Sequence, residues 1–137
     1  MKDFELDPRL AADSHWLVDG PACQVRLMDD ARFPWLVLVP RIADAVEWFD
    51  LGGSDQHLVL DEVSQAARLL RTESGCEKVN IGALGNIVRQ LHVHVVARRR
   101  GDAAWPGPVW GSGEAKRFSA IALEARLAEL RLQLARR

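Results

Sequence analysis

Short stretches of apolar residues predict the first strands of this chain. Apolar and polar residues alternate approximately over residues 22–28, which is typical of a half-buried strand. Residues 35–39 form a continuous apolar run that ends at Pro40. Because residues 29–34 between them have the composition of a turn, we expect the two strands to form a hairpin.

Helical spacing follows in the middle of the chain. Ser54 or Asp55 can cap a helix N-terminus, and Gly75 can end it. Between them, apolar residues recur at a spacing that predicts a helix lying against a sheet, namely Val59, Val63, Ala66, Ala67 and Leu70. We expect two further strands, at residues 79–83 and 90–96, and a short helix at residues 8–14.

The last third of the chain predicts an ordered loop and a long helix. Residues 98–113 contain two tryptophans, and tryptophan is rare in disordered segments. Residues 114–135 have the pattern of a helix with two apolar stripes, made of Leu123, Leu127, Leu130 and Leu134 and of Ile121, Ala125, Ala128 and Leu132. An apolar arc this wide is more than one sheet face covers, so we expect a homodimer.

These elements predict an α+β fold with one antiparallel sheet of about five strands, a central helix and a long C-terminal helix. The 137 residues have the length of one domain and contain no internal repeat, so we expect residues 1–137 to form a single domain. The composition, 48% hydrophobic and 27% charged, is that of an ordinary globular protein.

Charge and composition exclude several function classes. A formal net charge of −1 provides no general attraction to nucleic acid, and no apolar run is long enough to span a membrane. The first residues lack the apolar segment of a signal peptide, so we expect a cytoplasmic protein. Cys23 and Cys76 have no metal-binding or redox spacing and receive no role.

Two histidines in the strand predicted at residues 90–96 are the strongest chemical signal. Side chains alternate across a strand, so Gln90, His92 and His94 share one face, and the two imidazoles lie about 6.6 Å apart. Such a pair can address a phosphate or a metal ion, or simply form a solvated face. A metal needs a third protein ligand, and His15 and His57 are each isolated in sequence, so we expect no metal and no cofactor.

Several segments resemble one known family. The sequence QLHVHVV at residues 90–96 resembles the signature of the histidine-triad (HIT) superfamily, in which three histidines alternate with apolar residues. Residues 33–41 resemble the family's hairpin strand, which ends in proline and a basic residue, and residues 80–88 resemble the loop and strand before the triad. Trp105-Pro106 lies where some members carry Trp-Pro. The resemblance covers about residues 22–110.

The resemblance implies a nucleotide-binding hydrolase or transferase that cleaves at the α-phosphate of dinucleoside polyphosphates or nucleoside phosphoramidates. His92 matches the family's nucleophile, which is transiently nucleotidylated, and His94 matches the histidine that helps to hold the phosphate and to handle the leaving group's proton. Asn86 lies where members usually carry a phosphate-facing Gln, and Asn80 matches an Asn of the family's loop. Asp29 and Asp30 lie near the segment that contacts the ribose.

Two positions depart from the family pattern. Gln90 replaces the first histidine of the triad, and Trp35 replaces an upstream histidine that many members carry. Glutamine forms hydrogen bonds to phosphate but does not titrate near neutral pH, and tryptophan offers no acceptor. The positive charge of the site is therefore reduced. The alternatives to an enzyme are a nucleotide-binding protein without turnover and a metal-binding protein that uses His92 and His94.

The residues after the triad also have two readings. Arg98, the first residue of an Arg-Arg-Arg run, can bind distal phosphates of a polyphosphate, or the run can be a solvated strand exit. Trp105 and Trp110 can pack over a nucleotide, over a partner protomer or onto their own domain.

Overall fold

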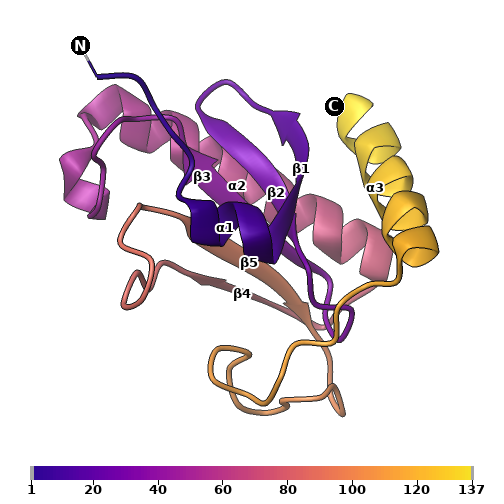
Figure 1. Ribbon diagram of the computed structural model, residues 1–137. Helices are drawn as coiled ribbons and strands as arrows, with labels where there is room; N and C mark the ends of the chain where they lie inside the picture. The colour runs from indigo at the N-terminus through magenta and orange to yellow at the C-terminus, as the bar shows by residue number, and fades with distance from the viewer. Residues whose placement is uncertain (1, 137) are drawn as a thin grey trace.

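The computed structural model describes residues 2–136, and its centre is a five-stranded sheet (Figure 1). The strands are β1 (Ser14–Asp19), β2 (Cys23–Met28), β3 (Trp35–Pro40), β4 (Lys78–Gly82) and β5 (Val93–Arg98). They lie in the order β1-β2-β3-β5-β4, and every neighbouring pair is antiparallel. The predicted α+β fold and the predicted hairpin of β2 and β3 are confirmed.

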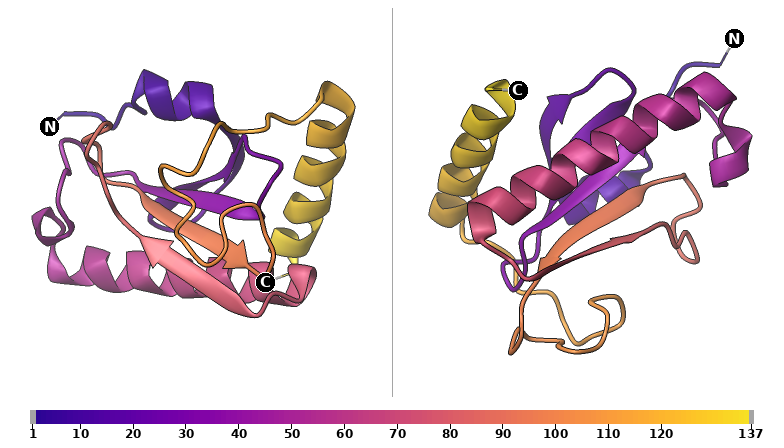
Figure 2. Two further views of the ribbon diagram at one scale, coloured as in Figure 1. Left: turned by 90° about the horizontal axis from the view of Figure 1, so that it is seen from below. Right: turned by 180° about the vertical axis from the view of Figure 1, so that it is seen from behind.

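Helices cover the sheet unequally. They are α1 (Pro8–Asp13), the 3₁₀-helix η1 (Trp48–Asp50), α2 (Gly53–Ser74) and α3 (Ala120–Ala135). The long helix α2 crosses one face of the sheet, while α1 lies on the opposite face and α3 stands beside α2 near β1 (Figure 2). Within residues 2–136, no helix is both long enough and apolar enough to cross a membrane.

The alternation of side chains along β3 and β5 creates two separate apolar clusters. Leu36, Leu38, Val93, Val95 and Ala97 point into the cluster that α2 and α3 cover. The other face carries a smaller cluster that includes Trp35, Val37, Val39, Val96 and Val109. His94 pairs with Val37 across the two strands and therefore lies on this second face, away from α2.

Three predicted boundaries were wrong. The histidine strand begins at Val93 rather than residue 90, so His92 lies just before it. The C-terminal helix begins at Ala120 rather than residue 114, because Ser119 caps it while the carboxylates of Asp29 and Asp30 hold the preceding segment through the N–H groups of Phe118 and Lys116. Helix α2 begins at Gly53 with Gly52 at its N-cap, so neither Ser54 nor Asp55 caps it. In addition, strand β1 was not predicted, because its buried residues do not alternate and its register shifts between Trp16 and Val18.

Candidate functional site

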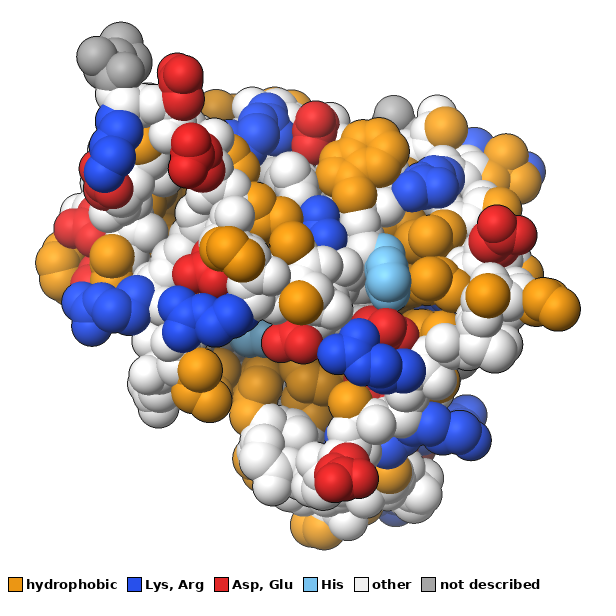
Figure 3. Space-filling view, viewed as in Figure 1, with side chains coloured by type: hydrophobic (Ala, Val, Ile, Leu, Met, Phe, Trp, Pro, Cys, Tyr) orange, Lys and Arg blue, Asp and Glu red, His pale blue; other side chains and the backbone are white. Residues whose placement is uncertain are grey.

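His92 and His94 line a pocket of about 520 Å³ on the face of the sheet that α2 does not cover. Its walls come from β3, from the segment before β5 and from the loop after β5. In Figure 3, which shows this face, hydrophobic side chains lie in a hollow above the loop at the bottom of the view, and acidic and basic side chains lie along its upper edge. The lining residues include Met28, Asp30, Arg32, Trp35, Leu84, Asn86, Ile87, Val88, His92, His94, Val109 and Trp110.

Hydrogen bonding defines the protonation of the His92 ring. Its Nδ1 lies 2.6 Å from the backbone oxygen of Gln90, and a carbonyl oxygen only accepts hydrogen bonds. Nδ1 therefore carries the proton, and in the neutral ring Nε2 keeps a free electron pair. His92 is only 6% exposed, and its ring centre lies 4.9 Å from that of His94. The arrangement presents one imidazole nitrogen as a nucleophile beside a second imidazole.

His94 is held in the opposite tautomer. The indole N–H of Trp35 donates to Nδ1 of His94 at 3.0 Å, so this nitrogen carries no proton. The ring is buried, and Trp110 contacts it edge to face with centroids 5.5 Å apart. Burial, and secondarily the charge of a protonated His92, lower the pKa of His94 from 6.5 to about 3. Near neutral pH, His94 is an uncharged ring with its proton on Nε2.

This depressed pKa predicts a pH dependence of stability. Below pH 6.5 the unfolded chain protonates His94, whereas the folded chain does so only near pH 3. The free energy of unfolding should therefore fall as the pH decreases through this window, with a contribution of up to about 1.4 kcal/mol per pH unit from this residue. Urea unfolding of the wild type and of His94→Gln at pH 6.5 and 5 measures it. The variant should lose less stability between the two pH values, and equal losses would contradict the prediction.

Trp110 and the segment before β5 form the apolar walls of the pocket. Leu84, Ile87 and Val88 line one side, and Asn86 lies among them as expected. The far edge of the Trp110 ring lies against Gly82, where an added Cβ would come within 3.0 Å of it. The sequence does not predict this contact, because the approach of Trp110 to His94 depends on the path of the whole loop.

Charge in the pocket is balanced. Arg32 is the only Lys or Arg among the described residues that line it, and its guanidinium forms an ion pair with Asp30 at 2.8 Å. Burial raises the pKa of Asp30, but hydrogen bonds from Arg32 and from the Lys116 backbone outweigh it and hold the carboxyl below its usual value. With His94 neutral, the site therefore has little net positive charge.

Gln90 contributes its backbone to the site rather than its side chain. The side-chain oxygen accepts from the Asp7 backbone at 2.8 Å, and the side-chain nitrogen donates to the Glu5 backbone oxygen at 2.8 Å. These bonds tie the N-terminal segment to the approach of β5. Gln90 does not line the 520 Å³ pocket, and it borders His92 only at a smaller neighbouring cavity of about 110 Å³. The side-chain role predicted for Gln90 therefore has no support in this geometry.

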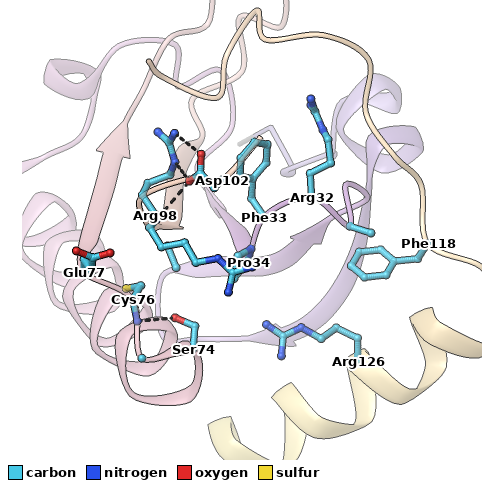
Figure 4. A pocket seen from close by; sticks show the side chains of 14 residues that line it. Arg32, Phe33, Pro34, Ser74, Cys76, Glu77, Arg98, Asp102, Phe118 and Arg126 are labelled. Atoms are coloured by element: carbon cyan, nitrogen blue, oxygen red, sulfur yellow. Dashed lines mark hydrogen bonds and ion pairs between the residues drawn. The ribbon is translucent and has the colours of Figure 1, made fainter. Parts of the chain in front are cut away.

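Arg98, Asn80 and Trp105 belong to a different cluster. The Arg98 side chain is 2% exposed, and its guanidinium donates to Asp102, to Asn80 and to the Gly107 backbone. Its charge also lies 5.7 Å from the centre of the Trp105 ring. Figure 4 shows Arg98 bound to Asp102 at a separate cavity of about 420 Å³. These three predicted substrate contacts do not line the histidine pocket, and they hold the loop after β5 in place.

Asp29 also has a structural environment. Its carboxylate accepts from the Phe118 backbone and from Arg117, and it lies 3.1 Å from Nε2 of His15. Asp29 thus anchors the segment before α3, and only its neighbour Asp30 reaches the pocket. Among residues 2–136, no group of three or more His, Cys, Asp and Glu side chains is arranged to hold a metal ion.

Comparison with known proteins agrees with this geometry. The HIT domain family model matches residues 9–101. The chain belongs to the HIT family. A histidine triad protein from Sinorhizobium meliloti is 50% identical, with 93% of this chain and 94% of that chain covered and a TM-score of 0.90. One from Bradyrhizobium japonicum is 44% identical, with 95% and 97% covered and a TM-score of 0.91.

A third HIT structure aligns over nearly the whole chain. The histidine triad protein from Marinobacter aquaeolei is 38% identical, covers 98% of both chains and has a TM-score of 0.95. No curated protein matches the sequence. The comparisons therefore establish the HIT family and the fold, and the chemistry of this member has to be argued from its own residues.

Proposed function

We propose that this HIT protein is a nucleotide-binding hydrolase or transferase that cleaves at the α-phosphate of dinucleoside polyphosphates or nucleoside phosphoramidates. The observation that carries the proposal is the hydrogen bond from Nδ1 of His92 to the Gln90 carbonyl, because it leaves Nε2 free to attack phosphorus. The pocket supports it with apolar walls for a base, with His94 beside His92 and with Asn86 among the lining residues.

The proposed reaction has two displacements. The electron pair on Nε2 of His92 forms a bond to the α-phosphorus while the bond to the leaving group breaks, and the leaving group takes the pair of the broken bond. A phosphate leaving group departs as an oxyanion, whereas an amine leaving group also takes up a proton from solvent. The nucleotidyl-imidazolium keeps its Nδ1 proton, which the Gln90 carbonyl stabilises. Water then attacks phosphorus and loses a proton to solvent, and the P–N bond breaks to return the pair to Nε2. For hydrolysis, the products are a nucleoside monophosphate and free enzyme.

The test is capture of the covalent intermediate. Wild-type protein is mixed with diadenosine tetraphosphate or adenosine phosphoramidate labelled at the α-phosphorus, quenched in base and examined by intact mass. We expect an adduct of one nucleotidyl group on the peptide that contains His92, stable in base and lost in acid. Nucleotide binding without adduct or mononucleotide release would instead support the binding protein without turnover, which the balanced charge of Arg32 and Asp30 favours.

We also propose a homodimer in the cytoplasm. One apolar stripe of α3 packs into the core through Leu123, Leu127, Leu130 and Leu134, but the other stays open, with Ile121 84% and Leu132 59% exposed. Cys23 and Cys76 are buried and free, which suits a reducing compartment. Size-exclusion chromatography with light scattering should give twice the monomer mass. A monomer at every concentration would contradict the dimer.

A further inference from the structure

Trp35 and His94 form a buried donor-acceptor pair at the bottom of the pocket. Trp35 pairs with Val96 on β5, and Val37 pairs with His94, so the Trp35 and His94 side chains are diagonal neighbours on one sheet face. Trp35 is 7% and His94 6% exposed, and their ring centres lie 5.6 Å apart. The indole N–H donates to Nδ1 at 3.0 Å.

The hydrogen bond between Trp35 and His94 can have only one direction. An indole nitrogen donates a hydrogen bond and accepts none, so Nδ1 of His94 must be the unprotonated nitrogen as long as the bond exists. The proton of the neutral ring then stays on Nε2, the nitrogen left to meet a ligand. The other rings next to His94 are those of His92 and Trp110. Two acidic or basic side chains, Arg32 and Asp30, are among the described residues that line the pocket, and they neutralise each other.

A neutral His94 in this state can donate a hydrogen bond but is a poor proton donor. Complete transfer of its Nε2 proton would leave an imidazolate, and the buried site has no unpaired cation among its described lining residues to stabilise that anion. Trp35 hydrogen-bonds to the opposite nitrogen, but it does not resupply a proton. His94 therefore acts like an oxyanion-hole donor: its fixed N–H stabilises the negative charge that develops in the transition state.

We propose that Trp35 is a positioning residue that locks His94 as a fixed Nε2–H donor, so that the site selects nucleotides whose leaving group departs as a stable oxyanion. The inference rests on the proposed function and narrows it. In the first displacement the P–O bond breaks, the electron pair stays on the leaving oxygen, and His94 stabilises that charge without giving up its proton. Phosphoanhydrides and aryl esters fit this chemistry. Phosphoramidates of alkyl amines do not, since their nitrogen must gain a proton from solvent.

The tautomer is tested without any catalytic readout. Two-bond proton-nitrogen NMR correlations of the imidazole rings identify which nitrogen of His94 carries the proton. At pH 7 we expect a single Nε2–H form in the wild type and exchange between both forms in Trp35→Phe, which keeps an aromatic ring but removes the donor. Trp16→Phe is the matched control, since Trp16 is exposed on β1 and bonds to Asp19. A protonated Nδ1 on His94 in the wild type would overturn the proposal.

The chemical role is tested by single-turnover formation of the His92 adduct. The probes are adenosine 5′-aryl phosphates with phenols of graded acidity and an adenosine 5′-alkylphosphoramidate. In the wild type, the rate of adduct formation should fall roughly tenfold for each unit by which the pKa of the phenol rises. The alkylphosphoramidate should react slowest. The solvent deuterium isotope effect on this rate should be close to unity. A flat dependence, or a large isotope effect, would show that a proton is transferred and would overturn the proposal.

Two substitutions, His94→Gln and His94→Ala, show whether His94 donates a hydrogen bond or transfers a proton. The amide of glutamine carries a donor and an acceptor at a spacing similar to that of the ring nitrogens but supplies no acidic proton. We expect His94→Gln to remain within about tenfold of the wild type, His94→Ala to lose about 10²–10³-fold, and Trp35→Phe to lose roughly tenfold. Equal losses in the Gln and Ala variants would count against the fixed donor. If no probe yields an adduct in the wild type, the proposed function fails, while the NMR result still decides the Trp35–His94 pairing.

Discussion

Replacing His92 by alanine is expected to abolish the nucleotidyl adduct and to lower turnover by roughly 10³-fold or more, because loss of a nucleophile removes the covalent path altogether. Nδ1 of His92 donates to the Gln90 carbonyl, so the electron pair on Nε2 is available for attack. His94 cannot take over, since its Nε2 carries the proton while Trp35 occupies Nδ1. Single-turnover adduct formation and steady-state release of mononucleotide measure the two effects.

The matched control is a histidine outside the pocket. His57 lies exposed on α2, with Nδ1 2.8 Å from the Gly53 backbone oxygen, and His57→Ala should keep wild-type adduct formation. Thermal unfolding of both variants identifies any loss of folded protein. An adduct that persists in His92→Ala would contradict the mechanism, and an unchanged turnover would show that the covalent path is not the one used.

Replacing Arg98 by methionine is expected to lower the free energy of unfolding by about 3–5 kcal/mol, the cost of breaking a buried ion pair by removing one partner. Arg98 and Asp102 have only 2% and 6% exposed side chains, and they lie 2.8 Å apart. The substitution leaves the Asp102 carboxylate, the Asn80 side-chain oxygen and the Gly107 carbonyl without this donor. Guanidinium or urea unfolding measures the loss.

The neighbouring Arg99 provides the control for Arg98. It is exposed, and Arg99→Met should change stability by no more than about 0.5 kcal/mol. The hydrogen bond from Arg98 is also the main reason that the pKa of Asp102 is lowered to about 2. That carboxylate stabilises the wild-type fold above its ordinary pKa of 3.8, and this contribution is lost as the pH falls toward 2. Equal stabilities of the two methionine variants would contradict the structural role of Arg98.

The Arg98 cluster shows why charge alone is a weak guide to a binding site. Three consecutive arginines at the end of the histidine strand suggest contacts to phosphates. Arg98, however, is the last residue of β5, and its side chain points inward, where Asp102 and Asn80 bind it. Asp29 and Asp30 both hold the segment that leads into α3, and of the two only Asp30 also lines the pocket. Such pairings join residues that lie 86 and 89 positions apart, and no local pattern encodes them.

Local patterns in the sequence are enough to predict the strands β2 and β3, the helix α2, the apolar side of the histidine strand and the closeness of His92 to His94. These features follow from side-chain periods of 2 and 3.6 residues, which are local properties of the chain. Contacts in the folded structure set which nitrogen of each histidine is free, which tryptophans line the pocket and which charges are already paired. Each of these depends on one contact across the fold, as between Trp35 and His94, 59 residues apart. The two histidines therefore have opposite tautomers: Nε2 of His92 keeps a free electron pair, whereas Nε2 of His94 carries the proton.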